Sequence, residues 1–245
     1  MKPMCTGKVA IVTGGSSGIG RSTALTLARE GAQVIVNYHQ AAEAADQVVA
    51  TITHQGGQAC AVQADIFAAA GCEHLVQTTL EQYGQIDICV INPGAGWHPE
   101  PPDMLDAAAA LDDLQRESAP ALYLLPLLLP RMYQQKWGRI IAIGMNPNLP
   151  SPAYAYNVAK AARQEIILQA HRSAWAQGVT INVVAPGPVA DEDSLADAIA
   201  QSQHAAAWQT RPTTSAQDVA ESIAFLCSEA GRFITGAVIP FQFSG

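Results

Sequence analysis

The segment Val9–Gly20, VAIVTGGSSGIG, constrains the fold most, because a short apolar run passes there through a glycine-rich turn into an amphipathic stretch. The run Val9–Val12 is typical of a strand buried on both faces of a parallel sheet. Within Ile19–Glu30, small and apolar side chains recur on one helical face: Ile19, Thr23, Ala24, Leu27 and Ala28. A strand, a glycine turn and a helix in this order predict the opening of a βαβ unit.

The glycine turn also predicts a binding site for an anion. The first N–H groups of a helix have no partner within the helix, and its dipole favours negative charge at that end. We expect Gly14 to allow the tight turn, Gly18 to let the backbone approach phosphates, and Gly20 to let the helix pack closely on the strand. A glycine-rich loop alone is weak evidence, since it can be only a turn. The flanking strand and helix favour a nucleotide pyrophosphate.

Apolar runs and helical segments alternate along the rest of the chain. Further strands are expected at Gln33–Asn37, Ala59–Gln63, Ile86–Ile91, Gly138–Gly144, Val179–Val184 and Ala237–Phe241. Further helices are expected at Ala41–Gln55, Ala69–Tyr83 and Ala153–Gln177, and from Ser215 or Ala216 to about Ser228. This alternation predicts an α/β fold with one domain over residues 1–245: a Rossmann-type, doubly wound parallel sheet of about seven strands with helices on both faces. Ligands of such sheets bind at the carboxyl ends of the strands.

Two stretches are less regular. The helical stretch from Met104 toward Met132 contains Pro120, Pro126 and Pro130, so we expect it to be kinked or split. The segment Asp191–Trp208 is polar and rich in alanine, and we interpret it as a mobile lid.

Composition excludes several classes of function. The chain has 245 residues and a net charge of −8, with 13 Lys plus Arg, so a nucleic-acid partner is not expected. The apolar run Ala121–Leu129 is about half of the ~20 residues that span a bilayer and is interrupted by Pro126, so we expect no membrane partner. Five cysteines without a C-x-x-C pair and an N-terminus without a signal-peptide pattern indicate a cytoplasmic protein. Six scattered histidines indicate no metal site.

Tyr156 and Lys160 form a candidate proton-transfer pair. Four residues apart on a helix, they share one face. A phenol titrates near pH 10, and a neighbouring ammonium lowers that pKa by favouring the phenolate. Such a tyrosine can give its proton to a carbonyl oxygen or remove one from an alcohol. An isolated Y-x-x-x-K is usually an ordinary exposed pair, but its place after the fifth predicted strand, behind the glycine turn, favours contact with a cofactor.

Six motifs in order carry a resemblance to a known family: Thr13–Gly20, Asp65-Ile66, Asn92-Pro93-Gly94 in place of N-A-G, Tyr156–Lys160, Pro186-Gly187 and Ile234-Thr235-Gly236. The sequence resembles the classical short-chain dehydrogenase/reductase family over essentially its whole length. Its general pattern is most similar to that of the 3-oxoacyl-[acyl-carrier-protein] reductases.

This resemblance implies Tyr156 and Lys160 as catalytic residues, with Lys160 also bonded to the nicotinamide ribose, and a homodimer or homotetramer. It implies the following cofactor contacts: Gly14, Ser16, Ser17, Gly18, Ile19, Gly20, Asn37, Tyr38, His39, Asp65, Ile66, Asn92, Gly94, Tyr156, Lys160, Pro186, Gly187 and Val189.

The substrate end departs from the family pattern at three positions. Met145 stands where the family has a serine that donates to the substrate oxygen, and its thioether has no proton to donate. The interval from Met145 to Tyr156 is also about two residues shorter than is usual in the family. Glu117 stands where an asparagine helps to hold a relay water, and Asp191 stands for a threonine that contacts the carboxamide of the cofactor.

Other residues are candidates to fill the missing roles. Asn146 carries an amide N–H that could reach the substrate oxygen, and Ser151 is a second candidate donor. Glu117 is a candidate acid or base. The resemblance implies that Trp97 and His98 line the substrate pocket, with surface exposure as the alternative.

The end of the second strand bears on the choice of cofactor. NAD-specific sheets of this type usually carry an acid there that bonds the adenosine ribose. Here the residues are Asn37, Tyr38 and His39, so nothing repels a 2′-phosphate, although Ser17 offers no charge and only Arg21 and His39 are basic. NADP(H) is therefore favoured, and NAD(H) stays open.

Two functions follow from these observations. The first is an NADP(H)-dependent oxidoreductase that reduces a carbonyl, or oxidises the alcohol, of a small molecule such as a 3-oxoacyl thioester or a secondary-metabolite intermediate. The alternative, which Met145 keeps open, is a non-redox or catalytically degenerate member that acts as a cofactor-binding sensor or scaffold, or with altered chemistry.

Overall fold

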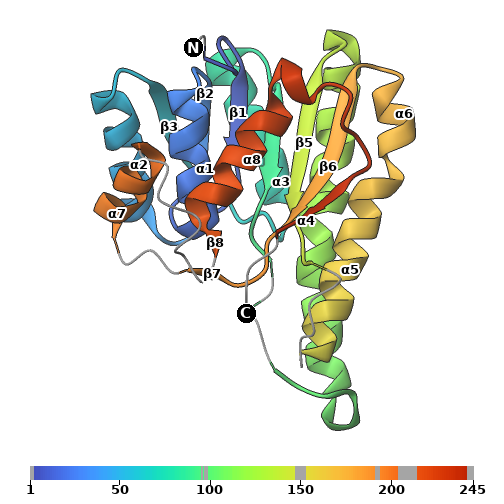
Figure 1. Cartoon of the computed structure of the whole chain (residues 1–245). Coiled ribbons are helices and arrows are strands. Elements are labelled where there is room, and N and C mark those ends of the chain that lie inside the picture. Colours follow the sequence, from blue (N-terminus) through green and yellow to red (C-terminus); the bar gives the residue numbers. More distant parts are fainter. Residues whose placement is uncertain are drawn as a thin grey trace.

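A parallel seven-stranded sheet forms the centre of the protein, in the order β3-β2-β1-β4-β5-β6-β9 (Figure 1). The computed structural model describes residues 3–94, 96, 99–146, 153–190, 194–203 and 214–241, the side chains of 201–203 excepted. The strands are β1 Val9–Val12, β2 Gln33–Tyr38, β3 Gln58–Gln63, β4 Ile88–Ile91, β5 Gly138–Ile143, β6 Val179–Ala185 and β9 Val238–Pro240. The predicted fold class is confirmed, and the strand order reverses between β1 and β4.

Helices cover both faces of this sheet. They are α1 Gly18–Arg29, α2 Ala42–His54, α3 Ala69–Tyr83, α4 Ala107–Gln135, α5 Tyr154–Gln169, α6 His171–Trp175, α7 Leu195–Gln203 and α8 Ala216–Cys227, with short 3₁₀ turns η1 Pro102–Met104 and η3 Glu229–Gly231. Figure 1 shows α1 and α8 in front of the sheet and α4 and α5 behind it.

Alternate strand residues supply two separate cores. On β1, Ala10 and Val12 join the core beneath α1, α2 and α8, while Ile11 joins the core beneath α3, α4 and α5. On β2, Val34 and Ile35 divide in the same way. Successive side chains of a strand point to opposite faces, so a strand covered on both sides needs an unbroken apolar run. This is why the run at Val9–Val12 signals the fold.

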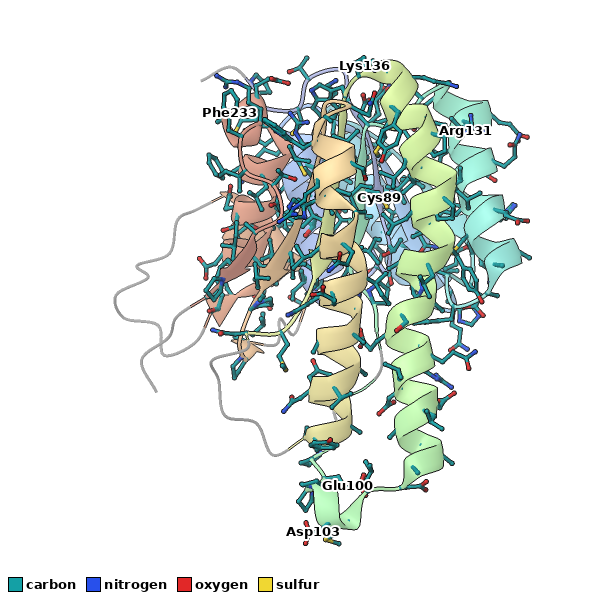
Figure 2. The ribbon with its side chains drawn as sticks, turned by 90° about the vertical axis from the view of Figure 1, so that its right-hand side faces the viewer. Cys89, Glu100, Asp103, Arg131, Lys136 and Phe233 are labelled. Carbon is teal, nitrogen blue, oxygen red and sulfur yellow. The ribbon has the colours of Figure 1, made fainter. Side chains whose placement is uncertain are left out.

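The proline-containing stretch is one helix, α4, of 29 residues, so of the two predicted alternatives the split is wrong and the kink stays a prediction. Asp106 begins it by accepting hydrogen bonds from the N–H groups of Ala108 and Ala109 at 2.9 and 3.2 Å. Leu124 and Leu128 are fully buried on its inner face. α4 packs along α5, and Figure 2 shows the two helices side by side, running down toward Glu100 and Asp103. Tertiary packing along this length outweighs the local cost of proline.

The long helix predicted for Ala153–Gln177 is instead two helices, α5 and α6, which meet at Ala170. Nδ1 of His171 lies 2.5 Å from the Leu168 carbonyl oxygen. The ring of His171 also lies against Gly236, where an added Cβ would come within 2.6 Å of it. At the junction the Ala170 N–H bonds to the Ile167 carbonyl oxygen at 3.3 Å, three residues back instead of four, so the α-helical ladder is interrupted there.

The segment predicted as a lid contains α7, and residues 191–193 and 204–208 of it lie outside the described part. A second, two-stranded parallel sheet joins β7, Val189–Ala190, to β8, Thr214–Ser215. Strands of two residues are too short to give a periodic pattern, so the sequence did not predict them. The predicted start of the last helix is confirmed, since Ser215 and Asp218 form a capping box at the beginning of α8.

From the sequence we expect no membrane partner, no metal site and reduced cysteines, and the described ranges of the structure bear on each of these. No helix there is long and apolar enough to cross a bilayer. No cluster of metal-ligating side chains occurs within those ranges either. All five cysteines are free thiols.

Candidate active site

The glycine-rich turn lies at the carboxyl end of β1, where the strand order reverses. Gly14 and Gly18 have positive φ angles of 60° and 50°, which side chains disfavour. A Cβ on Gly20 would collide with the carbonyl oxygen of Gly14, so α1 approaches the turn closely only because residue 20 is glycine. Ser17 and Gly18 are exposed, and Ser17 makes no side-chain capping bond to α1. The exposed start of α1 therefore fits the pyrophosphate of a dinucleotide.

Neighbouring strands brace this turn. Asn92, which follows β4, donates from Nδ2 to the carbonyl oxygens of Thr13 and Gly14 at 3.3 and 3.4 Å. The Thr13 hydroxyl donates to the Val90 carbonyl and accepts from the Asn92 N–H, both at 3.0 Å. From β2, Oδ1 of Asn37 accepts from the Gly14 N–H at 3.3 Å. The turn is thus held in one shape from both sides.

Asn37 itself is buried at the end of β2. Its Nδ2 donates to the carbonyl oxygens of Tyr38, Val62 and Ala64 at 3.1 to 3.3 Å, so the amide ties β2 to β3. His39 is exposed and Tyr38 is half-buried at the same strand end. These two side chains, unlike that of Asn37, are therefore accessible to a ligand at this strand end.

Other predicted cofactor residues lie at this same edge of the sheet. Asp65 follows β3, and its Oδ1 accepts from the Phe67 N–H at 3.0 Å, which shapes the turn into α3. Ile66 is buried beside it. Pro186, Gly187 and Val189 follow β6 and are half-buried.

Tyr156 and Lys160 lie on α5, and the Lys160 ammonium lies 5.4 Å from the centre of the Tyr156 ring. Lys160 is buried, and its Nζ lies 3.0 Å from Oε1 of Glu117 on α4. The Glu117 side chain is fully buried. The residue that replaces the asparagine of the family pattern therefore contacts the proposed catalytic lysine directly.

Arg163, which the sequence analysis missed, completes this cluster. Its NH1 lies 3.0 Å from Oε2 of Glu117 and donates to the Pro93 carbonyl oxygen at 2.9 Å. Its NH2 donates to the Ile91 carbonyl oxygen at 2.5 Å. The signal that could have found it is its spacing, because residues i and i+3 on a helix share a face and Arg163 follows Lys160 by three.

Burial and charge shift the pKa values in this cluster. Burial raises the pKa of Tyr156 above its usual value, the negative charge of Glu117 raises it further, and Arg163 opposes both. Burial lowers the pKa of Lys160, and the neighbouring Arg163 lowers it further, while Glu117 opposes them. The pKa of Tyr156 is therefore raised, opposite to the direction expected from the Tyr156 and Lys160 pair alone, because burial and a carboxylate absent from that reasoning act on the phenol.

The residues after β5 have partners within the chain. The Met145 N–H donates to Oε1 of Gln164 at 2.6 Å. Asn146 is fully buried, and its Nδ2 donates to the Phe241 carbonyl oxygen at 3.1 Å, so this N–H is engaged by the C-terminal segment. The candidates Trp97, His98, Ser151 and Asp191 lie outside the described residues.

A separate hollow of about 550 Å³ lies at the opposite edge of the sheet, where the turns before β2 and β3 meet. Its lining includes Gly31, Gln33, Gly56 and Gln58. Ligands of parallel sheets bind at the carboxyl ends of the strands, so this hollow is not part of the candidate site.

A parallel sheet with helices on both faces, a glycine turn at its switch point, and a tyrosine and lysine on one helix define a class of protein: the nucleotide-binding α/β oxidoreductases. Comparison with known proteins narrows this class. The sequence model of the family described as "Enoyl-(Acyl carrier protein) reductase" matches residues 14–242.

Individual relatives are similar to this chain over almost the whole length of both proteins. The chain is 37% identical over 243 residues to a 3-oxoacyl-[acyl-carrier-protein] reductase of Synechocystis sp., covering 94% of each chain. A 7α-hydroxysteroid dehydrogenase, solved with NADH and 7-oxoglycochenodeoxycholic acid, has a TM-score of 0.86 at 28% identity, covering 100% of this chain and 96% of that one. A short-chain dehydrogenase of Burkholderia cenocepacia, solved with NADP, has a TM-score of 0.81 at 28% identity, with 98% of each chain covered.

The chain belongs to the short-chain dehydrogenase/reductase family. It is an NAD(P)-dependent oxidoreductase of the kind that acts on CH–OH and C=O groups.

Proposed function

We propose that this protein is an NADP(H)-dependent reductase of carbonyl compounds, with Tyr156 as the proton donor. The observation that carries the proposal is the position of Tyr156 on α5, with the buried Lys160 ammonium 5.4 Å from its ring. The open glycine turn at the start of α1 fits the pyrophosphate of the cofactor, and we propose the residues named above from the family pattern as its contacts. The reverse reaction, oxidation of the alcohol, uses the same groups.

The residues of the chain have distinct tasks in this mechanism. A nicotinamide bound at this site would supply a hydride to the carbonyl carbon. Tyr156 donates its phenolic proton to the oxygen as negative charge develops there. An ordinary phenol already keeps this proton at neutral pH, and the raised pKa of Tyr156 extends that range to higher pH. Lys160 supplies positive charge beside the phenol. Met145 cannot donate a second hydrogen bond, and the loss of one such donor typically lowers the rate on the order of 10²–10³-fold.

The end of β2 supports the preference for NADP(H). It carries Tyr38 and His39 and no carboxylate, so a 2′-phosphate meets no negative charge there. The two solved relatives bind different cofactors, NADH in one and NADP in the other, so family membership alone leaves both open.

A 3-oxoacyl thioester is the substrate class we favour. It is supported by the similarity to the Synechocystis 3-oxoacyl-[acyl-carrier-protein] reductase at 37% identity. A secondary-metabolite ketone is the other class that the sequence pattern left open. We expect the predicted lid, of which α7 is the described part, to decide between them.

We further propose a homodimer or homotetramer formed by a single-domain, cytoplasmic chain. Exposed apolar side chains along α4 and α5, namely Leu122, Tyr154 and Val158, support association through these helices. One sheet shared by nearly all described strands supports the single domain. Free thiols at all five cysteines support a reducing compartment.

A paired tyrosine experiment tests the function. Binding of NADPH and NADH is measured by fluorescence titration, and turnover is measured with 3-oxoacyl thioesters. We expect tighter binding of NADPH and, in Tyr156→Phe, a loss of turnover of at least about 100-fold with NADPH binding retained. Tyr154→Phe is the matched control, because Tyr154 is exposed at the start of the same helix. Unchanged turnover in Tyr156→Phe would refute the assignment.

A further inference from the structure

We propose that Glu117 is a positioning residue for this reaction: its carboxylate joins Lys160 and Arg163 in one buried ion-pair cluster and, through its charge, holds the phenolic proton of Tyr156 in place for donation. The inference deepens the function proposed above and rests on it in one respect, the role of Tyr156 as proton donor.

The geometry leaves the carboxylate of Glu117 shared between two cations. One oxygen lies 3.0 Å from Nζ of Lys160, and the other lies 3.0 Å from NH1 of Arg163. All three side chains are at least nine-tenths buried. The carboxylate also lies against Gly94, where any side chain would collide with it. Glu117 therefore joins α4, α5 and the turn after β4 at one point.

Charge balance explains why a carboxylate, and not an amide, suits this position. Lys160 and Arg163 lie three residues apart on α5, so two cations share one buried helix face and repel each other. The carboxylate compensates one of the two charges, and an asparagine would compensate neither. Arg163 is held in turn by the carbonyl oxygens of Pro93 and Ile91. The three side chains together carry one net positive charge.

This cluster sets the proton affinity of Tyr156. Glu117 from α4 and Arg163 from α5 act on the phenol, and the Lys160 ammonium lies 5.4 Å from the centre of its ring. Among the elements packed against α5, α4 also carries the buried Asp113 one turn before Glu117, α6 carries His171 and Arg172 at the far end of α5, and β6 carries no charged residue. The negative charge of Glu117 favours the protonated phenol, so the pKa of Tyr156 is raised by burial and then by this carboxylate. Tyr156 therefore remains a proton donor to higher pH than it would beside an amide.

The test is a titration of Tyr156 in the protein without cofactor. The chain has six tyrosines, so tyrosinate absorbance is measured against pH and the curve of the matching Tyr156→Phe variant is subtracted. We expect the midpoint for Tyr156 to fall in Glu117→Gln, which removes the charge and keeps the shape of the side chain. Glu165→Gln, an exposed carboxylate on α5, is the control and should leave the midpoint unchanged. A midpoint that is unchanged or higher in folded Glu117→Gln overturns the proposal.

A second variant covers the case in which Glu117→Gln does not fold. Glu117→Asp keeps the charge but withdraws it by about 1.5 Å, the length of one carbon–carbon bond. A fall of the Tyr156 midpoint relative to the wild type supports the proposal, and no fall overturns it. Turnover of the wild type is measured separately, so that failure of the proposed function can be told apart from failure of the role of Glu117. If the wild type reduces a carbonyl but the Tyr156 midpoint is unchanged in the Glu117 variant, only the role of Glu117 is refuted. A wild-type protein that reduces no carbonyl refutes the function and leaves the titration interpretable.

Discussion

Replacing Glu117 by glutamine should destabilise the fold more than replacing its partner Arg163 by methionine. Glu117→Gln leaves Lys160 and Arg163 as two buried cations without a carboxylate. Arg163→Met leaves Lys160 and Glu117 as a neutral pair, although the carbonyl oxygens of Ile91 and Pro93 then lose their hydrogen bonds from Arg163. The two variants therefore differ in whether uncompensated charge stays buried.

The contact distances give the size of the effect. At 3.0 Å and an effective dielectric constant of about 20, each cation attracts the carboxylate by roughly 5 kcal/mol. Desolvation of the ions offsets much of this, and removing one partner of a buried pair typically costs about 3–5 kcal/mol. We expect a loss of that size for Glu117→Gln. We expect a loss of about 1–3 kcal/mol for Arg163→Met, which removes hydrogen bonds to two carbonyl oxygens. For a chain of this length, the first corresponds to a fall in Tm of roughly 6–20 °C.

Urea unfolding measures these differences, provided that the wild type and the variants unfold with equal m-values. The double variant Glu117→Gln/Arg163→Met closes a mutant cycle, and we expect it to be more stable than the sum of the single losses predicts, by about 0.5–3 kcal/mol. The reasoning is refuted if Glu117→Gln costs less than about 1 kcal/mol, or less than Arg163→Met costs, because neither result is compatible with a buried carboxylate shared by two cations.

Four further outcomes follow from the site. Gly20→Ala places a methyl group against the Gly14 carbonyl oxygen and should weaken NADPH binding by about 10-fold or more in a fluorescence titration. Gly56→Ala is the control: the backbone of Gly56 also has a positive φ, but it lies far from the glycine turn, so NADPH binding should be unchanged. Met145→Ser restores a hydroxyl donor and should raise kcat for carbonyl reduction by about 10-fold or more, without changing the Kd for NADPH; an unchanged kcat would place residue 145 away from the substrate oxygen. Asn37→Asp removes the donor to three carbonyl oxygens and should lower stability by about 1–3 kcal/mol in urea unfolding, which an unchanged midpoint would contradict. Because the pKa of Tyr156 is raised, the rate of carbonyl reduction should stay constant through neutral pH and fall only above the usual phenol pKa. The rate of alcohol oxidation should rise with pH over the same range. A plateau of the oxidation rate near neutral pH would show a lowered pKa instead.

The sequence predicted most of the fold because its strands carry a local signal. A strand buried on both faces must be apolar throughout, and the runs at β1, β2 and β6 show this directly. α4 shows the limit of such reasoning. Its three prolines disfavour a helix locally, but packing against α5 and the sheet comes from residues far away in the sequence. No local pattern reports that packing.

The candidate site was predictable in part for the same reason. The glycine turn and the pair Tyr156 and Lys160 are short motifs, so they are visible without the fold. Glu117 stood out only as a departure from the family pattern, with an open role. Arg163 was not singled out at all, because its contacts with the chain after β4 span about 70 residues of sequence. The direction of the Tyr156 pKa depends on burial and on Glu117, and both are properties of the folded chain.

The glutamate at position 117, where the family pattern has an asparagine, depends on the residues around it. A carboxylate fits there only because residue 94 is glycine, since any side chain at that position would collide with it. The carboxylate is tolerated in the core only because Lys160 and Arg163 compensate its charge. Arg163 is tolerated in turn only because the carbonyl oxygens of Ile91 and Pro93 accept its other hydrogen bonds. Glu117→Asn alone should therefore not recover the site of the relatives. It leaves the same uncompensated charges as Glu117→Gln, with a shorter side chain.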